Sequence, residues 1–427
     1  MLRKIIADGT NEYDFLKELE KRSGETDKKV TESVSTIIED VRQNGDQAVE
    51  KYTLKFDGKL PEYFEVPQEV ISDALSEADE DFVNALLDAM ENIADFHHRQ
   101  KEQGFIHPKA NGVILGQRVR GLERVGLYVP GGTAAYPSSV LMNAIPAKIA
   151  GVKEIIMVTP PQKDGTPNKD ILVAASVCGV DRVFLTGGAQ AVAALAYGTE
   201  TIPKVDKIVG PGNIYVATAK KLLFGTVDID MIAGPSEILV LADENADPKY
   251  VAADLMSQAE HDVLASALLV TTSEKLVDAV EIELEKQLAG LSRKEIIQKS
   301  LADFGAAIIC DCIDCAVELA NALAPEHLEV LLENPMEYLG KLDNAGSVFL
   351  GPYAPEPLGD YFAGPNHVLP TGGTARFFSP LSVHSFTKRS SFIYYTREAL
   401  EEAKDDIVLI AEKEGLTAHA NAIKVRF

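Results

Sequence analysis

The sequence is poor in cysteine, has no tryptophan and contains no long apolar run. Four cysteines in 427 residues do not make a disulfide framework, and Cys310, Cys312 and Cys315 have no fourth cysteine nearby to complete a thiolate metal site. We therefore interpret these three as core and turn residues. No apolar stretch approaches the roughly 18 residues of a membrane span, and no charged-then-apolar leader opens the chain. These absences predict a cytoplasmic protein that makes no contact with a membrane.

Basic charge is also scarce. Forty-one Lys and Arg face 65 Asp and Glu, which gives a formal net charge of −24 at pH 7. An acidic protein repels a polyanion unless a basic stripe intervenes, and no such stripe stands out, so nucleic acid is not an expected partner. The remaining composition, 46% hydrophobic and 25% charged residues, is typical of a folded globular chain with two or more domains.

Short apolar segments alternate with glycine turns and helical patterns through most of the chain. Continuous runs of this length are typical of strands buried in parallel sheets. They lie at 153–160, 181–188, 206–212 and 236–243, and a second group lies at 265–272, 305–311 and 346–352. The pattern predicts an α/β protein with two Rossmann-like parallel-sheet domains, preceded by a helical N-terminal region.

The C-terminal residues, from Ser382 onward, contain one amphipathic helix that ends at Gly415 and a short final segment. A piece of this size cannot bury a core of its own. We therefore expect it to lie on another domain or on another subunit.

Three glycine turns follow predicted strands, at 131–133, 187–190 and 210–213. Glycine at a strand-to-helix turn lets the backbone approach an anion, while the helix N-terminus presents free N–H groups to it. The turns are therefore candidate phosphate cradles at the carboxyl edge of a sheet. None has the G-x-G-x-x-G or P-loop spacing, so tight turns without a ligand are an equal interpretation.

Gln258 and His261 lie three residues apart in a predicted helix, so their side chains share a face on which they can bind one metal ion. Considered alone, such a pair is more often a solvated surface patch. No catalytic glutamate stands in a His-x-x-x-His frame, which excludes the zinc-protease pattern.

Pro325, Glu326 and His327 open a segment that we predict to be a helix over 326–333. A helix N-terminus stabilises a carboxylate and lowers the pKa of a histidine, so this pair would supply an ionised glutamate and a neutral imidazole as bases. Acidic residues are also common in first turns that have only a structural role.

Two further segments carry polar residues of interest. The glycine- and proline-rich stretch 351–376 is too long for a plain connector and contains Asp360 and His367, and long ordered loops are often functional. In the tail, Glu414 precedes His419 by five residues. A lone tail histidine is usually just exposed.

Together these motifs closely resemble those of the histidinol dehydrogenases. The similarity is carried by GLYVPGGTAAYPSSVLMNAIPAKIAG, TGGAQAVAALAYGT, VGPGNIYVATAKK, DMIAGPSEILVLAD, ADLMSQAEHD, APEHLEV, GSVFLG, GPNHVLPTGGTAR and, in the tail, EGLTAHANAIKVR. The resemblance implies oxidation of L-histidinol to L-histidine through L-histidinal, the last step of histidine biosynthesis. It also implies two NAD+ per reaction and one zinc ion per subunit of a homodimer.

Carried over position by position, the resemblance implies a role for each site residue. Glu326 would activate water, and His327 would be the base in both oxidations. The implied zinc ligands are Gln258, His261, Asp360 and His419. The implied NAD contacts are Tyr128, Gln190 and Asn213, and the implied substrate contacts are Ser236, Glu414, His327 and the four zinc ligands.

We accordingly expect four parts in the chain. They are an N-terminal arm (1–25), an α/β domain carrying the zinc and catalytic residues (26–115 plus 236–380), a Rossmann-like NAD-contacting domain (116–235) and a C-terminal tail (381–427). The resemblance implies that the tail crosses to the partner subunit, where Glu414 and His419 complete the other active site.

Two alternatives compete with this interpretation. One is a zinc hydrolase or deaminase that uses Glu326 and a metal-bound water without NAD. The other is a non-catalytic nucleotide-binding or assembly module that uses only the glycine turns. Both leave the implied zinc ligands unexplained as a group.

Overall fold

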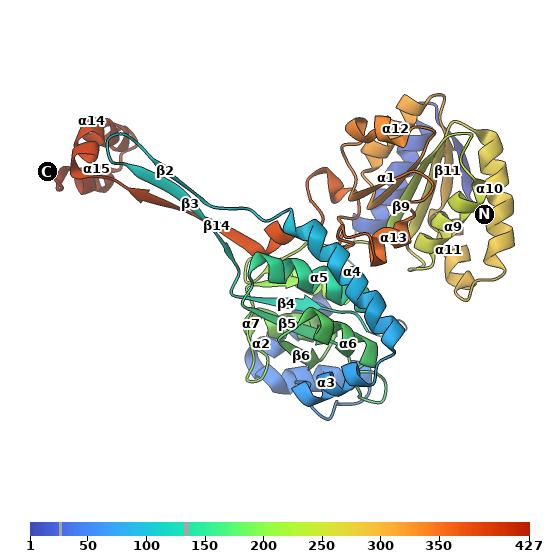
Figure 1. Ribbon diagram of the computed structural model, residues 1–427, viewed down its shortest axis with the longest axis horizontal. Coiled ribbons are helices and arrows are strands. Elements are labelled where there is room, and N and C mark those ends of the chain that lie inside the picture. The colour runs from blue at the N-terminus through green and yellow to red at the C-terminus, as the bar shows by residue number, and fades with distance from the viewer. Residues whose placement is uncertain (25–27, 132–135) are drawn as a thin grey trace. The chain divides into compact units, whose positions relative to one another are not determined.

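The structure, a computed structural model, describes residues 1–24, 28–131 and 136–427 (Figure 1). The chain forms two compact units, the first made of residues 1–100 and 122–386 and the second of residues 101–121 and 387–427. The first unit contains two parallel sheets covered by helices, which confirms the predicted α/β class with two Rossmann-like sheets. Among the described residues, no helix has the length and apolar character needed to cross a membrane.

The first sheet of this unit has five parallel strands in the order β6-β5-β4-β7-β8. The strands are β4 (Arg124–Tyr128), β5 (Glu154–Thr159), β6 (Arg182–Leu185), β7 (Lys207–Val209) and β8 (Asp228–Ile229), and the connecting helices are α5 (Pro137–Ala150), α6 (Lys169–Cys178), α7 (Gly188–Tyr197) and α8 (Ile214–Leu223). The strand order reverses direction between β4 and β7. Ligands of doubly wound sheets bind at the carboxyl ends of the strands beside such a reversal.

The second sheet has six parallel strands in the order β1-β11-β10-β9-β12-β13. The strands are β1 (Arg3–Ile6), β9 (Glu237–Ala242), β10 (Ser266–Thr271), β11 (Ala306–Ile309), β12 (His327–Leu331) and β13 (Ser347–Leu350). The helices of this part are α1 (Asn11–Gly24), α9 (Pro248–Ala259), α10 (Glu274–Leu288), α11 (Lys294–Phe304), α12 (Ile313–Leu323) and α13 (Glu356–Tyr361). Here the order reverses between β9 and β12.

Three N-terminal helices pack on the helices that cover the five-stranded sheet: α2 (Lys28–Asp57) on α7 and α8, α3 (Gln68–Ser76) on α6, and α4 (Glu80–His98) on α5 and α6. Val34 and Val41 of α2 share a core with Ile156, while Ile93 of α4 shares the opposite core with Ile155. Successive strand residues point to opposite faces, so these helices add an outer layer on both sides of the sheet. The predicted grouping of 26–115 with 236–380 is therefore wrong for these helices, because an apolar helix face does not specify which sheet it covers.

The predicted N-terminal arm is also wrong as a separate part. β1 pairs with β11, and Phe15 and Leu16 of α1 lie in one core with Leu239 and Leu241 of β9. The first residues therefore complete the six-stranded sheet. Residues 25–27, where this arm was expected to end, lie outside the described residues.

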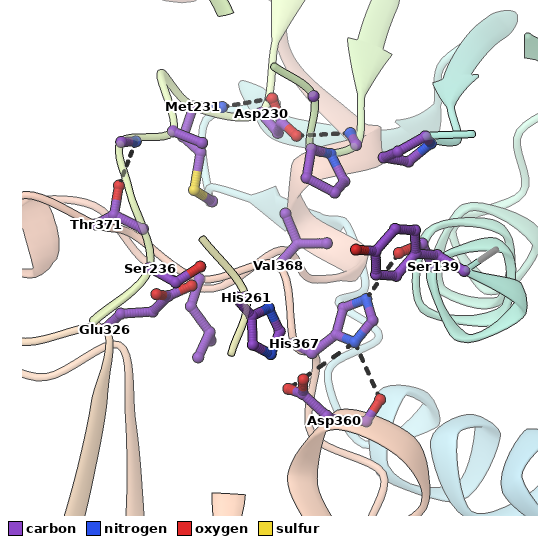
Figure 2. Close-up of a pocket in the computed structure, with 18 of the residues that line it drawn as sticks. Ser139, Asp230, Met231, Ser236, His261, Glu326, Asp360, His367, Val368 and Thr371 are labelled. Carbon is purple, nitrogen blue, oxygen red and sulfur yellow. Dashed lines mark hydrogen bonds and ion pairs between the residues drawn. The ribbon is translucent and has the colours of Figure 1, made fainter. Parts of the chain in front are cut away.

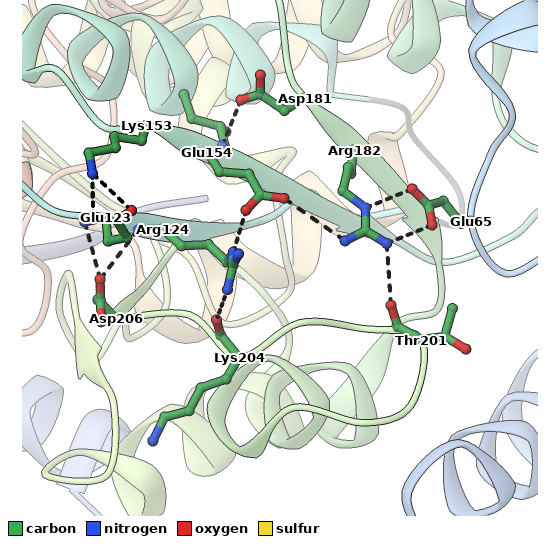
Figure 3. A network of polar contacts seen from close by, with 11 residues as sticks. Glu65, Glu123, Arg124, Lys153, Glu154, Asp181, Arg182, Thr201, Lys204 and Asp206 are labelled. Atoms are coloured by element: carbon green, nitrogen blue, oxygen red, sulfur yellow. Dashed lines mark hydrogen bonds and ion pairs between the residues drawn. The ribbon is translucent and has the colours of Figure 1, made fainter.

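Charged side chains connect the amino ends of three strands in the five-stranded sheet (Figure 3). Arg182 donates two hydrogen bonds of 2.7 Å to Glu65, and Glu154 lies between Arg182 and Arg124. Arg124, Glu154 and Arg182 are the first residues of β4, β5 and β6. This network stabilises the edge opposite the carboxyl ends, where ligands of such sheets bind.

The second unit contains an antiparallel sheet in the order β14-β3-β2 and two helices. Its elements are β2 (Phe105–Pro108), β3 (Ile114–Gly121), β14 (Thr387–Tyr394), α14 (Arg397–Lys413) and α15 (Thr417–Lys424). Ile106, Ile393 and Ile410 are each at least 60% exposed, which agrees with the expectation that the tail cannot bury its own core. The tail begins later than predicted, because Leu381, Val383 and Phe386 are buried in the first unit.

The cysteine prediction is partly wrong. Cys310, directly after β11, is buried as expected. Cys312 and Cys315 are exposed and joined by a disulfide where α12 begins. The Cys-x-x-Cys spacing at a helix start places both sulfurs on one turn.

Candidate active site

The carboxyl edge of the five-stranded sheet and the amino edge of the six-stranded sheet line one cavity of about 340 Å³ in the first unit. Glu326 and His327 come from the start of β12, Ser236 precedes β9, and Gly210 and Asn213 follow β7. Gln258 also lines this cavity. So do His261 and Asp360 (Figure 2). The structure therefore brings together residues that the sequence places far apart.

Glu326 and His327 do not lie in a helix. His327 is the first residue of β12, a strand between β9 and β13 whose five residues are all buried. The predicted helix over 326–333 is wrong, because a short apolar run has no periodicity that separates a buried strand from a buried helix. Because Glu326 and His327 do not lie at a helix N-terminus, a helix dipole does not set the protonation of this pair.

The main chain of Glu237 holds both residues. Its N–H donates to Glu326 Oε2 over 2.9 Å, and its carbonyl lies 3.1 Å from Nδ1 of His327. A carbonyl only accepts hydrogen bonds, so Nδ1 carries a hydrogen and the lone pair of the neutral ring is on Nε2. Nε2 is buried without a partner, 3.8 Å from Asp360 Oδ1.

The buried charges shift the pKa values of the protein's own groups strongly. Burial raises the pKa of Glu326 to about 8. Burial lowers the pKa of His327, but the carboxylates of Glu326, Asp360 and Glu356 outweigh it and raise the value to about 10. A cation beside these carboxylates would oppose their effect on His327.

Gln258, His261 and Asp360 have the arrangement of a metal site. Nδ1 or Nε2 of His261 and carboxylate oxygens of Glu356 and Asp360 lie within 4.8 Å of one another. Gln258 is 1% exposed, and both polar atoms of its amide are buried without a partner. Imidazole nitrogen and carboxylate or amide oxygen form a donor set that suits zinc. The residues present therefore fit a zinc ion.

Glu356 was missed in the sequence. It precedes Asp360 by one turn of α13, and its Oε2 accepts a 2.9 Å hydrogen bond from Ser257, next to Gln258. Burial raises the pKa of Glu356 to about 7. The spacing of four between Glu356 and Asp360 was the signal, but the proline- and glycine-rich segment around them concealed the short helix.

His367 supports Asp360. One ring nitrogen of His367 lies 3.0 Å from the main-chain oxygen of Asp360, and the other lies 3.4 Å from Ser139 Oγ (Figure 2). His367 is therefore held between two parts of the chain, and it fixes the position of α13 at the cavity.

A larger cavity of about 1340 Å³ contains the expected cofactor contacts Tyr128, Gln190 and Asn213. Burial raises the pKa of Tyr128 to about 12, and its hydroxyl oxygen accepts a hydrogen bond from Gly188 N–H over 3.0 Å. Its own hydrogen remains available to a ligand. Oε1 of Gln190 is buried without a partner.

Asn213 joins the two cavities, because it lines both of them. Its side chain caps α8 by accepting hydrogen bonds from Tyr215 and Val216. The predicted glycine turns at 187–190 and 210–213 do follow strands at this edge. In the predicted turn at 131–133, Gly131 lines both cavities. Gly132 and Thr133 lie outside the described residues.

The remaining predicted residues belong to the second unit. Glu414 is the C-cap of α14, and His419 lies in the first turns of α15. Both are exposed.

Comparison with known proteins identifies the family of the chain. A family model described as histidinol dehydrogenase matches residues 20–427. The histidinol dehydrogenase of Clostridium acetobutylicum is 58% identical over 99% of both chains. The chain belongs to the histidinol dehydrogenase family. The family assignment made from the sequence motifs is confirmed.

Two further relatives match over nearly the full length of the chain, one by sequence and one by structure. The histidinol dehydrogenase of Listeria innocua is 58% identical over 98% of both chains. The crystal structure of histidinol dehydrogenase from Elizabethkingia anophelis matches with a TM-score of 0.93 and 39% identity, covering 100% of this chain and 98% of that one.

Membership of the histidinol dehydrogenase family decides between the alternatives. Its enzymes are NAD-dependent, zinc-containing oxidoreductases that oxidise histidinol to histidine in histidine biosynthesis. The expected activity and both expected cofactors are thereby confirmed, and a zinc hydrolase or a non-catalytic module is excluded.

Proposed function

We propose that the cavity around Glu326 and His327 is where the chain oxidises L-histidinol to L-histidine through L-histidinal, with two NAD+. The observation that carries this proposal is the double contact made by the main chain of one residue, Glu237. It fixes the Glu326 carboxylate and the Nδ1 atom of His327 side by side. Nε2 of His327 is then left without a hydrogen-bond partner, 3.8 Å from Asp360 Oδ1.

His327 is the base of both oxidations in this proposal. Nε2 accepts the hydroxyl proton of the alcohol as the C–H bond breaks, and it does the same for the hydrated aldehyde. NAD+, when bound, supplies the acceptor for the hydride in each oxidation. The hydrogen bond from Nδ1 to the Glu237 carbonyl stabilises the imidazolium that forms.

Glu326 has a separate role between the two oxidations. The aldehyde must gain a water molecule before a second hydride can leave. Glu326 takes one proton from that water as its oxygen attaches to the carbonyl carbon. The Glu237 N–H that holds Oε2 keeps this carboxylate oriented while it does so.

Gln258, His261 and Asp360 would hold the zinc ion, with His419 from the tail of a second copy of the chain. Zinc, when bound, supplies a Lewis acid that fixes the orientation of the substrate. The unpartnered Gln258 amide and the close approach of His261 and Asp360 support this assignment. Ser236 and Glu414 complete the substrate contacts in the proposal, and Tyr128, Gln190 and Asn213 contact NAD.

The proposed assembly is a homodimer in the cytoplasm with shared active sites. The exposed apolar residues of the second unit support a partner for it. Mixing a His419→Asn variant with a His327→Asn variant tests the sharing, because a mixed dimer would contain one intact site. We expect partial recovery of activity, and no recovery in confirmed mixed dimers would contradict shared sites.

The central experiment measures NADH absorbance after L-histidinol and excess NAD+ are added to the zinc-loaded protein. We expect two NADH per histidinol, loss of the reaction on chelation, and its return with zinc. One NADH per histidinol, or none, would refute the proposal of a complete four-electron oxidation at this site.

A further inference from the structure

A buried ion pair lies in the wall of the catalytic cavity and has no place in the mechanism above. It joins Lys220, in the last turn of α8, to Asp230, which follows β8. The two side chains are only 3% and 1% exposed. Both line the cavity that contains Glu326 and His327.

The two partners of this pair hold the same residue from both sides. Asp230 Oδ2 accepts a 2.8 Å hydrogen bond from the N–H of Gly210, and Lys220 Nζ donates a 2.9 Å hydrogen bond to the carbonyl of Gly210. Oδ1 of Asp230 accepts the N–H of Met231 over 2.7 Å, a contact visible in Figure 2. The backbone polar groups of Gly210 are thus both bound by charged side chains.

Gly210 has no side chain with which to hold its own position. Its φ is +109°, and a Cβ atom there would collide with the carbonyl oxygen of Tyr128. The turn 210–213 leads directly into Asn213, the cap of α8 that lines both cavities. The path of this turn after β7 therefore depends on contacts made from outside it.

Burying two charges is costly, and an apolar pair of similar size often stabilises a fold as well or better. The two charges suit the two groups of this glycine, because a cation donates a strong hydrogen bond to a carbonyl and an anion accepts one from an N–H. A role in placing the turn accounts for the pair better than a role in global stability.

We propose that Lys220 and Asp230 are positioning residues for NAD+, acting through Gly210 on the turn that carries Asn213. The inference rests on the proposed function, in which Asn213 and Tyr128 contact the cofactor. Neither Lys220 nor Asp230 touches the reacting atoms.

The test compares Lys220→Met and Asp230→Asn with the control Lys207→Met. Lys207 is a buried lysine of the same sheet that pairs with Asp228 and donates to the carbonyl of Ser385, and it lines neither cavity. The zinc-loaded variants are assayed for kcat and for the KM of NAD+ and of histidinol. NADH binding is followed by nucleotide fluorescence, which the absence of tryptophan leaves free of overlap.

We expect Lys220→Met to raise the KM of NAD+ and the Kd of NADH by about tenfold, the effect of one lost charge-assisted hydrogen bond. The KM of histidinol should stay within about twofold of that of the unmodified protein, since this loss is confined to the cofactor turn. Asp230→Asn keeps one acceptor for Gly210, so its effect should be smaller. Lys207→Met should leave all three constants unchanged.

An unchanged KM of NAD+ in folded Lys220→Met, or an equal rise in both KM values, would overturn the inference. If Lys220→Met does not fold, Asp230→Asn alone decides the matter by the same comparison. Failure of both to fold, with Lys207→Met intact, would show that the pair serves the fold and not the cofactor. A failed proposed function is distinguishable, because the unmodified protein would then form no NADH from histidinol.

Discussion

Replacing Glu326 by glutamine tests the division of labour between the two candidate bases. The amide has the size of the carboxylate and still offers an oxygen to the N–H of Glu237, which now lies 2.9 Å from Oε2. It cannot take a proton from water. We therefore expect the fold and the first oxidation to survive, and the hydration of the aldehyde to fail.

The magnitude follows from the chemistry and from the burial of Glu326. A positioned general base contributes about 10²- to 10⁴-fold to a rate, so oxidation of supplied L-histidinal should slow by that range. Oxidation of the alcohol should slow by less than about tenfold, because it uses His327 as its base. Burial already raises the pKa of Glu326 to about 8, so a neutral amide adds no desolvation cost and the melting temperature should not fall.

The assay follows NADH in single turnovers with histidinol and, separately, with histidinal. In the variant we expect one NADH per histidinol to form quickly and the second slowly, with an aldehyde that semicarbazide can trap. Glu65→Gln makes the same change at the amino edge of the five-stranded sheet, outside the cavity (Figure 3), and should behave as the unmodified protein. Equal slowing of the two oxidations, or a normal rate with histidinal, would refute the assignment.

Three other perturbations test separate parts of the structure. His261→Asn should lower zinc content and turnover together, each by at least about tenfold, as measured by metal analysis and NADH formation; near-normal values for both would remove His261 from the ligand set. Arg182→Ala breaks the two hydrogen bonds to Glu65 at a partly exposed site. Denaturant unfolding should show that the free energy of unfolding falls by about 1–2 kcal/mol, while kcat is unchanged. A loss of activity in the folded variant would contradict the separation of the amino edge of the five-stranded sheet from the active site. Burial raises the pKa of Asp57 to about 6, so its charged form destabilises the native state and the free energy of unfolding falls as pH rises from about 4 to 6. Asp57→Asn should remove about 1 kcal/mol of this fall after allowance for partial exposure. Identical profiles of stability against pH for the variant and the unmodified protein would contradict this prediction.

The parts of the fold that the sequence predicted correctly depend on neighbours along the chain. Continuous apolar runs such as 154–159 and 266–271 are β5 and β10, because a strand buried on both faces has no room for polar residues. The turns at 187–190 and 210–213 were found because a backbone with positive φ requires glycine, as at Gly188 and Gly210. Gln258 and His261, predicted to share one face of a helix, both line the cavity, although α9 ends at Ala259 and His261 lies just beyond its C-cap.

Tertiary contacts decided the rest. The segment from His327 to Leu331 is a strand because β9 and β13 lie on either side of it, and its own sequence suits a buried helix equally well. Helices α2 and α4 show an apolar face in the sequence, yet only packing determined that they lie on the helices of the five-stranded sheet.

The contacts that organise the active site had no signature in the sequence at all. Glu326 and His327 are held by the main chain of Glu237, and every residue has the same N–H and carbonyl. Gly210 is likewise held by Lys220 and Asp230, ten and twenty residues away. The sequence by itself thus determined which residue types are available for the chemistry and where the chain must turn. Only the folded chain decided which of them meet, because a backbone group becomes a specific partner only when a distant side chain is brought within hydrogen-bond distance of it.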